Sequence, residues 1–154
     1  MAILVTIARV ALGLLLIVAG VLKAHDGVAA TASSIAAYRI LPAAVVGPIG
    51  VALPYVEILL GAMLAAGLFT RVAAYIASGQ FAIFAAGVAS LVIRQIPADC
   101  GCFGSGVKTP PSWGHVAGDV ALALVALGVA RFGPGLLVVD DWLGGGTGAV
   151  QDEP

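Results

Sequence analysis

Residues 72–93 read VAAYIASGQFAIFAAGVASLVI, a stretch that contains no charged residue. A helix needs about 20 predominantly apolar residues to cross the hydrocarbon core of a bilayer. This stretch is long enough, and its continuous apolar run differs from the alternating segments of about ten residues that are typical of a membrane β-barrel. We therefore predict a transmembrane helix over residues 72–93.

The same pattern occurs three more times in the chain, each time with at most two charged residues. The fold class we predict is an all-α membrane protein, a four-transmembrane-helix up-down bundle. We expect residues 1–132 to form the membrane domain and residues 133–154 a mobile tail. The three further spans are expected over residues 3–23, 45–69 and 113–131.

The composition of the whole chain supports a membrane protein. The chain has 154 residues, of which 61% are hydrophobic and 10% are charged, and its mean hydropathy is +1.12. A soluble domain has about 25% charged residues. The net charge of −1 and the lack of a Lys/Arg cluster exclude a nucleic-acid-binding protein. The first residues, MAILVTIA, lack the positive charge of a signal peptide, so we expect the first span to be retained.

The connections between the spans differ in length and define two membrane faces. Residues 24–41 are too polar to cross the membrane and are rich enough in alanine for a short surface helix. Residues 69–71 make a tight connection, whereas residues 94–112 make a long connection that contains both cysteines. We call the face with the two long connections the long-loop face and the opposite one the short-turn face.

Ionisable residues inside the spans are candidates for a functional site, because they rarely persist in lipid without a partner or a polar cavity. At about 1.5 Å of rise per residue, Glu57 and Asp119 both fall about 9 Å below the long-loop face. The nearest candidate counter-charges are Lys23, His25, Arg39 and His115. We expect a polar layer here, which is either a structural ion pair or a polar site that opens to the long-loop face.

Arg9 is expected at a different depth. By the same rise it lies about 12 Å from Glu57 along the membrane normal, towards the short-turn face. We expect Arg9 to act mainly as a structural anchor, with Gln80 near its level.

The string Asp99-Cys100-Gly101-Cys102-Phe103-Gly104 is the sharpest motif in the chain. Residues two apart can reach the distance that a disulfide needs, and the small ring should make the bond easy to reduce. A redox dithiol is therefore favoured, with Arg94 and Lys108 placed to favour a thiolate. Two alternatives stay open: inert thiols, or a metal site completed by Asp99 and His115. The spacing does not match the usual zinc patterns, so we predict no metal.

Taken together, these residues resemble the MauE/DoxX family of redox-associated membrane proteins, and its MauE branch in particular. The resemblance implies a four-helix membrane bundle with both termini in the cytoplasm and with Cys100 and Cys102 as the redox pair. It also implies motif residues within or next to the membrane, among them Arg9, Tyr38 and Arg39. The matching segments are Ala8-Arg9 with Gly13, Ala19-Gly20-Val21-Leu22-Lys23, Tyr38-Arg39-Ile40-Leu41-Pro42, Leu53-Pro54-Tyr55-Val56-Glu57 with Gly61, Gly67-Leu68-Phe69-Thr70-Arg71 and Asp99 to Gly104.

The function implied by the resemblance is that of a thiol-disulfide redox component in the inner or plasma membrane. It would act with an extracytoplasmic thioredoxin-like partner during maturation of a secreted, disulfide-containing amine dehydrogenase. No cofactor is certain, and a quinone is the electron acceptor that the resemblance allows. The cysteine loop would then be extracytoplasmic, although the positive-inside rule counts more Lys and Arg on the long-loop face and favours the opposite orientation.

Two other functions remain open. The chain is alternatively a non-enzymatic assembly or scaffold subunit of a redox complex, as a homo- or hetero-oligomer with incidental cysteines. It is alternatively a small-solute or proton pathway that uses Glu57 and Asp119.

Overall fold

The computed structural model describes residues 2–98, 110–133 and 135–136, and these form five helices and no strand. Four of the helices are long and apolar enough to cross a membrane, which confirms the predicted all-α fold with four spans. The fifth is the short helix expected between the first two spans. The helices are α1 (Ala2–Asp26), α2 (Val28–Ala37), α3 (Ala43–Ala66), α4 (Thr70–Ile93) and α5 (Trp113–Phe132).

The tight connection lies slightly earlier in the chain than the apolar pattern predicts. Gly67 adopts a left-handed conformation, with φ 74°, and ends α3 at Ala66. The backbone N–H of Gly67 donates to the carbonyl oxygen of Leu64, and that of Leu68 donates to Met63. Glycine adopts this conformation without steric cost, so it stops the helix although the apolar sequence continues. The turn then needs only three residues, and α4 begins at Thr70.

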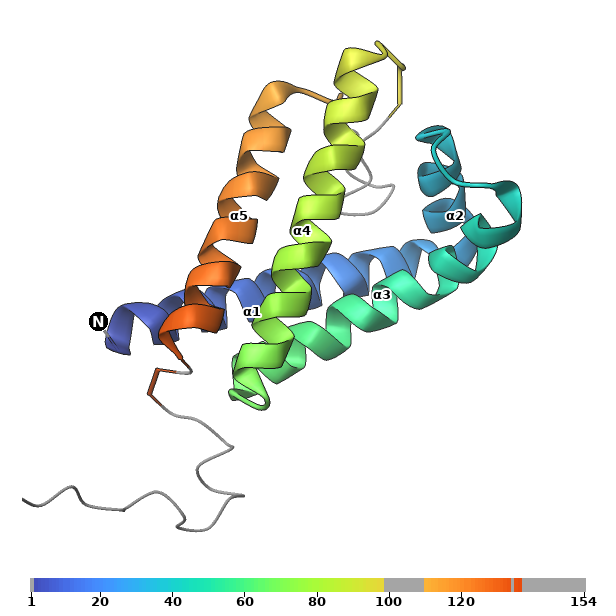
Figure 1. The fold of residues 1–154 in the computed structure, drawn as a ribbon. Coiled ribbons are helices and arrows are strands. Elements are labelled where there is room, and N and C mark those ends of the chain that lie inside the picture. Colours follow the sequence, from blue (N-terminus) through green and yellow to red (C-terminus); the bar gives the residue numbers. More distant parts are fainter. Residues whose placement is uncertain (1, 99–109, 134, 137–154) are drawn as a thin grey trace, which may run out of the picture.

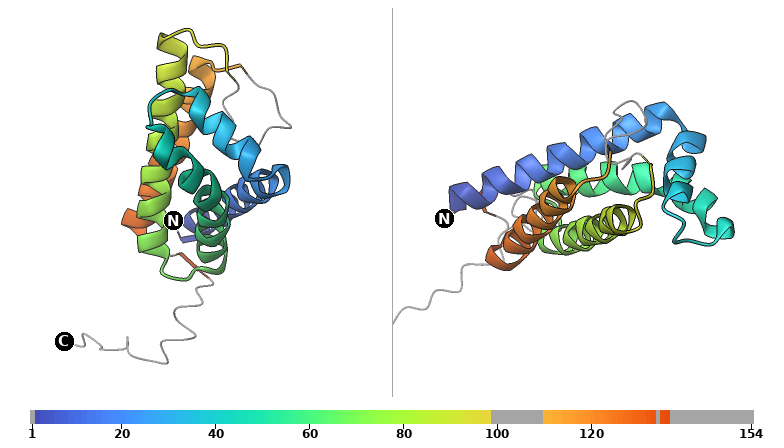
Figure 2. Two further views of the ribbon diagram at one scale, coloured as in Figure 1. Left: turned by 90° about the vertical axis from the view of Figure 1, so that its right-hand side faces the viewer. Right: turned by 90° about the horizontal axis from the view of Figure 1, so that it is seen from above.

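The long helices form two antiparallel pairs (Figure 1). Helix α1 packs along α3, and α4 packs along α5. The two pairs cross instead of running side by side along their whole length, as Figure 1 shows, and Figure 2 gives two further views of this arrangement. Helix α2 packs mainly on α3, close to the end at which α1 finishes.

Two glycines set the close approach of α1 and α3. A Cβ atom on Gly13 would lie 2.7 Å from the carbonyl oxygen of Gly61, and one on Gly61 would lie 2.6 Å from that of Gly13. No side chain fits at either position without moving a helix. Small residues at a crossing let helix backbones approach closely in lipid, where packing must replace the hydrophobic effect.

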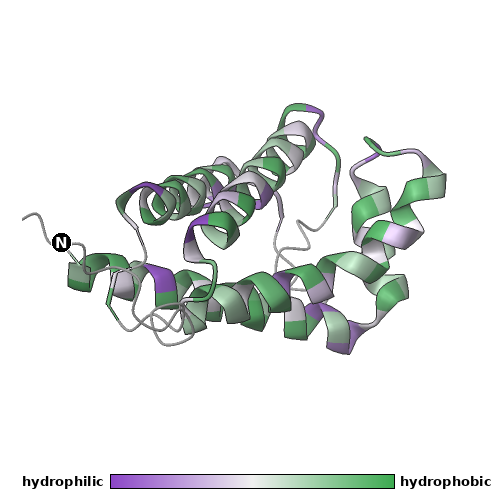
Figure 3. Ribbon diagram, turned by 60° about the horizontal axis from the view of Figure 1, so that its bottom comes forward, coloured by the Kyte–Doolittle hydropathy of each residue, from purple (hydrophilic) through white to green (hydrophobic). Residues whose placement is uncertain are grey.

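The interior and the outer surface are both apolar. Figure 3 shows hydrophobic colour along most of the long helices, and large side chains such as Ile83 (71% exposed) face outward. A surface of this kind suits hydrocarbon and not water. The buried side chains of all four long helices meet in one core cluster of Leu12, Leu16, Leu60, Leu64, Ala73, Ala74, Ala77, Phe81, Ala126, Val129 and Ala130.

Candidate functional site

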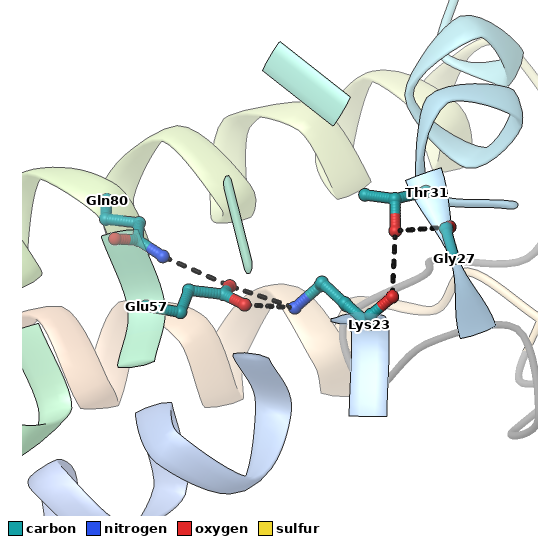
Figure 4. Close-up of polar contacts among 5 residues, drawn as sticks. All are labelled: Lys23, Gly27, Thr31, Glu57 and Gln80. Carbon is teal, nitrogen blue, oxygen red and sulfur yellow. Dashed lines mark hydrogen bonds and ion pairs between the residues drawn. The ribbon is translucent and has the colours of Figure 1, made fainter. Parts of the chain in front are cut away.

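Three helices bring a lysine, a glutamate and a glutamine together inside the bundle (Figure 4). The Nζ atom of Lys23, near the end of α1, lies 2.9 Å from Oε1 and 2.8 Å from Oε2 of Glu57, in α3. The amide Nε2 of Gln80, in α4, donates to Oε1 of Glu57 at 3.1 Å. The carboxylate of Glu57 is therefore held by donors from α1 and α4.

The Lys23–Glu57 ion pair is withdrawn from the surface. Lys23 is 3% exposed and Glu57 is fully buried. The Lys23 ammonium also lies 5.7 Å from the centroid of the Phe84 ring. Burying two charges is costly, and the attraction offsets that cost only when the geometry is good and further hydrogen bonds are present. The two-oxygen contact with Lys23 and the hydrogen bond from Gln80 meet that condition.

A cavity of about 190 Å³ lies beside this ion pair, between all four long helices. Glu57 contributes from α3 and Asp119 from α5, so the structure places the two carboxylates on the walls of one cavity. Most of the remaining wall is aliphatic or aromatic. The lining residues are Leu15, Leu16, Ala19, Glu57, Phe81, Phe84, Gly114, His115, Gly118, Asp119 and Leu122.

Asp119 differs from Glu57 in its hydrogen bonding. Its side chain is 9% exposed, and its Oδ2 atom is buried with no hydrogen-bond partner among the described residues. Asp119 lies within electrostatic range of His115 and Lys23. This carboxylate is thus near positive or titratable groups, but one of its oxygens has no donor in the described part of the chain.

His115 is positioned by the start of α5. Ser112 caps this helix, because its Oγ accepts from the backbone N–H of His115 at 3.4 Å. The same Oγ lies 2.8 Å from Nδ1 of the His115 ring. The cap therefore orients an imidazole that lines the cavity one turn before Asp119.

Lys23 contacts Glu57 but is not part of the cavity wall, and three other predicted intramembrane residues, Tyr38, Arg39 and Arg9, do not line the cavity either. Arg39 is exposed and follows α2 with a positive φ of 52°. The backbone carbonyl of Tyr38 accepts a hydrogen bond from Nη1 of Arg94 at 2.9 Å, so these two residues connect the ends of α2 and α4. The direction of α2 thus carries Tyr38 and Arg39 away from Glu57.

Arg9, the third of these residues, is 1% exposed and lies elsewhere. Its Nη2 donates to the backbone carbonyl of Leu136, beyond the end of α5, at 3.2 Å. Leu136 is also held by Thr6, whose Oγ1 accepts from the Leu136 backbone N–H at 2.7 Å. Arg9 thus links α1 to the segment after α5, and its role as an anchor stays a prediction.

The expectation that Gln80 lies at the level of Arg9 is wrong, because Gln80 contacts Glu57. Sequence reasoning also did not select Phe84, which faces Lys23. The only signal for Gln80 was its amide, the one long polar side chain in a span that otherwise holds small, hydroxyl or apolar residues.

Cys100 and Cys102 lie outside the described residues, as do Asp99 and Lys108. The predicted dithiol, and the alternative metal site with Asp99 and His115, therefore remain predictions from the sequence. Among the described residues, no group of three or more His, Cys, Asp and Glu is placed to hold a metal ion.

Comparisons with known proteins agree on one family. The family model described as methylamine utilisation protein MauE matches residues 1–131. The methylamine utilization protein MauE of Paracoccus denitrificans is 34% identical over 94 residues, which are 60% of this chain and 50% of that protein. The chain thus spans about half the length of this relative. No solved structure matches the chain. With four helices suited to a membrane and a match over almost all of them, the chain belongs to the MauE family of methylamine-utilisation membrane proteins.

Proposed function

We propose that this protein is the membrane component of a thiol-disulfide exchange system, with Cys100 and Cys102 as its redox pair. Its partner would be an extracytoplasmic thioredoxin-fold protein, and the client a secreted methylamine dehydrogenase that needs disulfides. The observation that carries the proposal is the Cys100-Gly101-Cys102 string in a chain of the MauE family. The family links the protein to methylamine utilisation, and the two cysteines are the residues that would carry out the exchange.

The proposed exchange conserves electrons and protons. A thiolate of the reduced partner attacks one sulfur of the Cys100–Cys102 disulfide, whose S–S bond breaks as a mixed disulfide forms. The second thiol of the partner then resolves the mixed disulfide. The partner leaves oxidised, and Cys100 and Cys102 hold two electrons and two protons as thiols. Regeneration of the pair needs a two-electron acceptor, for which we propose the quinone class.

We propose that the connection with the cysteines faces the outside of an inner or plasma membrane and that both termini are cytoplasmic. An easily reduced disulfide persists outside the reducing cytosol. The burial of one counted cation supports this orientation against the one that the positive-inside rule favours. Lys23, one of the cations counted on the long-loop face, is buried and neutralised by Glu57, so it is a weak orientation signal.

The four-helix frame is suited to present this connection. Helix α4 ends and α5 begins at the same end of their antiparallel pair (Figure 1). That end is also braced, because Arg94 bonds Tyr38 and Ser112 caps α5. Both ends of the connection therefore leave the membrane domain from fixed points.

A trapping experiment tests the proposal. In Cys102→Ala, Cys100 is left as a lone thiol that can run the exchange in reverse, by attacking the disulfide of the oxidised partner. Cys102 is then absent and cannot release the partner, so a mixed disulfide with Cys100 should accumulate and be identified by a non-reducing gel and mass spectrometry. The matched control is the Cys100→Ala/Cys102→Ala double variant, which should trap nothing. A mixed disulfide with a thioredoxin-fold protein supports the proposal. If Cys102→Ala captures no such protein and the double variant still matures the dehydrogenase, the cysteines are incidental.

That second outcome would favour a non-enzymatic scaffold subunit. The Lys23–Glu57–Gln80 contact gives this alternative its own support, because it ties three spans together.

A further inference from the structure

Two arginines meet at the peptide bond that follows Tyr38, where α2 ends. The Nη1 atom of Arg94 donates to the carbonyl oxygen of Tyr38 at 2.9 Å. This carbonyl belongs to the peptide bond between Tyr38 and Arg39, so the Arg94 guanidinium lies beside the backbone from which the Arg39 side chain starts. Both arginines are exposed. The structure thus brings two positive side chains to one point, from the ends of two different helices.

Neither arginine is neutralised within the described part of the chain. No carboxylate of the described residues pairs with Arg39 or Arg94. Arg94 gives one of its five N–H donors to Tyr38, and the side chain of Arg39 gives none to a described residue. Two like charges in one place repel each other, and an anion between them relieves the repulsion. The pair therefore has both the charge and the hydrogen-bond donors for an anionic ligand.

The local backbone holds the arginines in this place. A Cβ atom on Gly87, in α4, would lie 2.9 Å from Cε1 of Tyr38, so the tyrosine ring lies against the bare backbone of that helix. Arg39 then adopts a φ of 52°, a left-handed conformation that glycine adopts without steric cost and arginine does not. The turn alone would favour glycine, and the arginine contributes a side chain that the turn does not need.

The surroundings of the pair are those of the boundary between hydrocarbon and headgroups. Ile93, which precedes Arg94, ends a helix suited to span a membrane and is 70% exposed. Ile40, which follows Arg39, is 53% exposed. Apolar side chains next to both arginines thus face the lipid, and arginines at such a boundary place their guanidinium groups among the headgroups. The anion available at this level is the phosphate of a phospholipid, which arginine binds with paired hydrogen bonds.

The two positive charges favour an anionic phospholipid over a zwitterionic one. In phosphatidylcholine a cationic group accompanies the phosphate, and the arginines would repel it. Phosphatidylglycerol carries the same phosphate diester without a cation. The attraction of one Lys or Arg side chain to anionic lipid corresponds to about fivefold in affinity.

We propose that Arg39 and Arg94 bind the phosphate of an anionic phospholipid, whose acyl chains lie along the exposed apolar side chains at the end of α4. The bound lipid would join the end of α2 to the end of α4, and so connect the two antiparallel helix pairs. This inference rests on described residues and is independent of the cysteine chemistry.

The test is lipid binding to the purified full chain in detergent micelles, measured by native mass spectrometry. Phosphatidylglycerol and phosphatidylcholine with identical acyl chains are titrated separately. We expect the first phosphatidylglycerol to bind at least about tenfold more tightly than the first phosphatidylcholine, because two arginines contribute. Arg39→Gln and Arg94→Gln should each lower this preference about fivefold, with the fold checked by circular dichroism.

Arg71→Gln is the matched control for charge, because Arg71 is exposed at the opposite end of α4 from Arg94. This variant should keep the preference for phosphatidylglycerol. A loss as large as that of Arg39→Gln would show that net charge alone attracts the lipid, and would overturn the proposal.

A pair of glycine variants tests the geometry without changing any charge. Gly87→Leu should displace the Tyr38 ring and lower the preference, since even a Cβ atom there meets the ring. Gly79→Leu is the control on the same helix, because a Cβ atom on Gly79 meets nothing within 4 Å, and it should keep the preference. Equal preferences in these two variants would contradict a site built on the position of Tyr38.

Two further measurements address other anions. Glycerol 1-phosphate carries a phosphate without acyl chains, and displacement of phosphatidylglycerol by an equal concentration of it would overturn a lipid as the ligand. Asp99, which lies outside the described residues, is the acid nearest to Arg94 in the sequence. Asp99→Asn should leave the preference unchanged. A gain of about fivefold or more would show that Asp99 occupies the arginine pair, which would also overturn the proposal.

Discussion

Replacing Glu57 with alanine should destabilise the helix bundle by about 3–5 kcal/mol, the cost of breaking a buried ion pair. The Lys23 ammonium lies 2.8 Å from the nearer Glu57 oxygen. At that separation and an effective dielectric constant of about 20, the gross attraction is about 6 kcal/mol. The variant would leave Lys23, which is 3% exposed, as a charge without this partner inside the membrane domain.

A double-mutant cycle measures this effect. Unfolding of Glu57→Ala, Glu57→Leu, Lys23→Met and the Lys23→Met/Glu57→Leu variant is followed by circular dichroism in detergent micelles as denaturing detergent is added, and the last three variants form the cycle with the unaltered protein. The doubly apolar variant should recover most of the stability, because removing both charges also removes their desolvation cost. The stability of Glu57→Gln should lie between that of Glu57→Ala and that of the unaltered protein, since the amide keeps a hydrogen-bond acceptor but loses the charge. If the two single costs add to within about 0.5 kcal/mol in the double variant, the charges are not coupled and the reasoning is refuted.

Two further predictions concern helix packing and capping. Gly61→Leu should push α1 away from α3 and lower the free energy of unfolding by about 1–3 kcal/mol or more, because even a Cβ atom there would lie 2.6 Å from the carbonyl oxygen of Gly13. In Gly79→Ala the added Cβ atom would meet nothing within 4 Å, so this variant should stabilise α4 by up to about 1 kcal/mol. Equal effects of the two changes on the melting temperature would contradict the close approach. Ser112→Ala should cost about 1 kcal/mol and speed hydrogen exchange in the first turn of α5, and unchanged exchange there would show that the cap does not stabilise the helix.

Much of the fold could be predicted because each span is a long apolar run with few charges. The limits of all four long helices fall within three residues of the predicted ones, and the polar segment after α1 does contain a short helix. The end of α3 was placed too late, because the apolar sequence continues through Gly67 while the left-handed glycine stops the helix.

The candidate site could be predicted only along the membrane normal. The rise per residue put Glu57 and Asp119 at one depth, and they line one cavity. The rise per residue did not predict Gln80 as a partner of Glu57. The depth of a residue in the membrane also depends on how far its helix pair tilts, and Glu57 and Gln80 lie on different pairs. The direction of α2, which takes Tyr38 and Arg39 away from the cavity, is likewise set by packing on α3 and has no signature in the apolar pattern.

The most direct measurement of whether the cysteines form a redox pair outside the cytosol is labelling in intact cells with a membrane-impermeant, mass-tagged maleimide. Cys100 and Cys102 are the two cysteines of the chain, so every shift on a gel comes from them. We predict no labelling of the untreated protein and labelling at both positions after mild reduction, without permeabilisation. Labelling that requires permeabilisation would place the pair on the cytoplasmic side, and labelling of both thiols before reduction would contradict a disulfide.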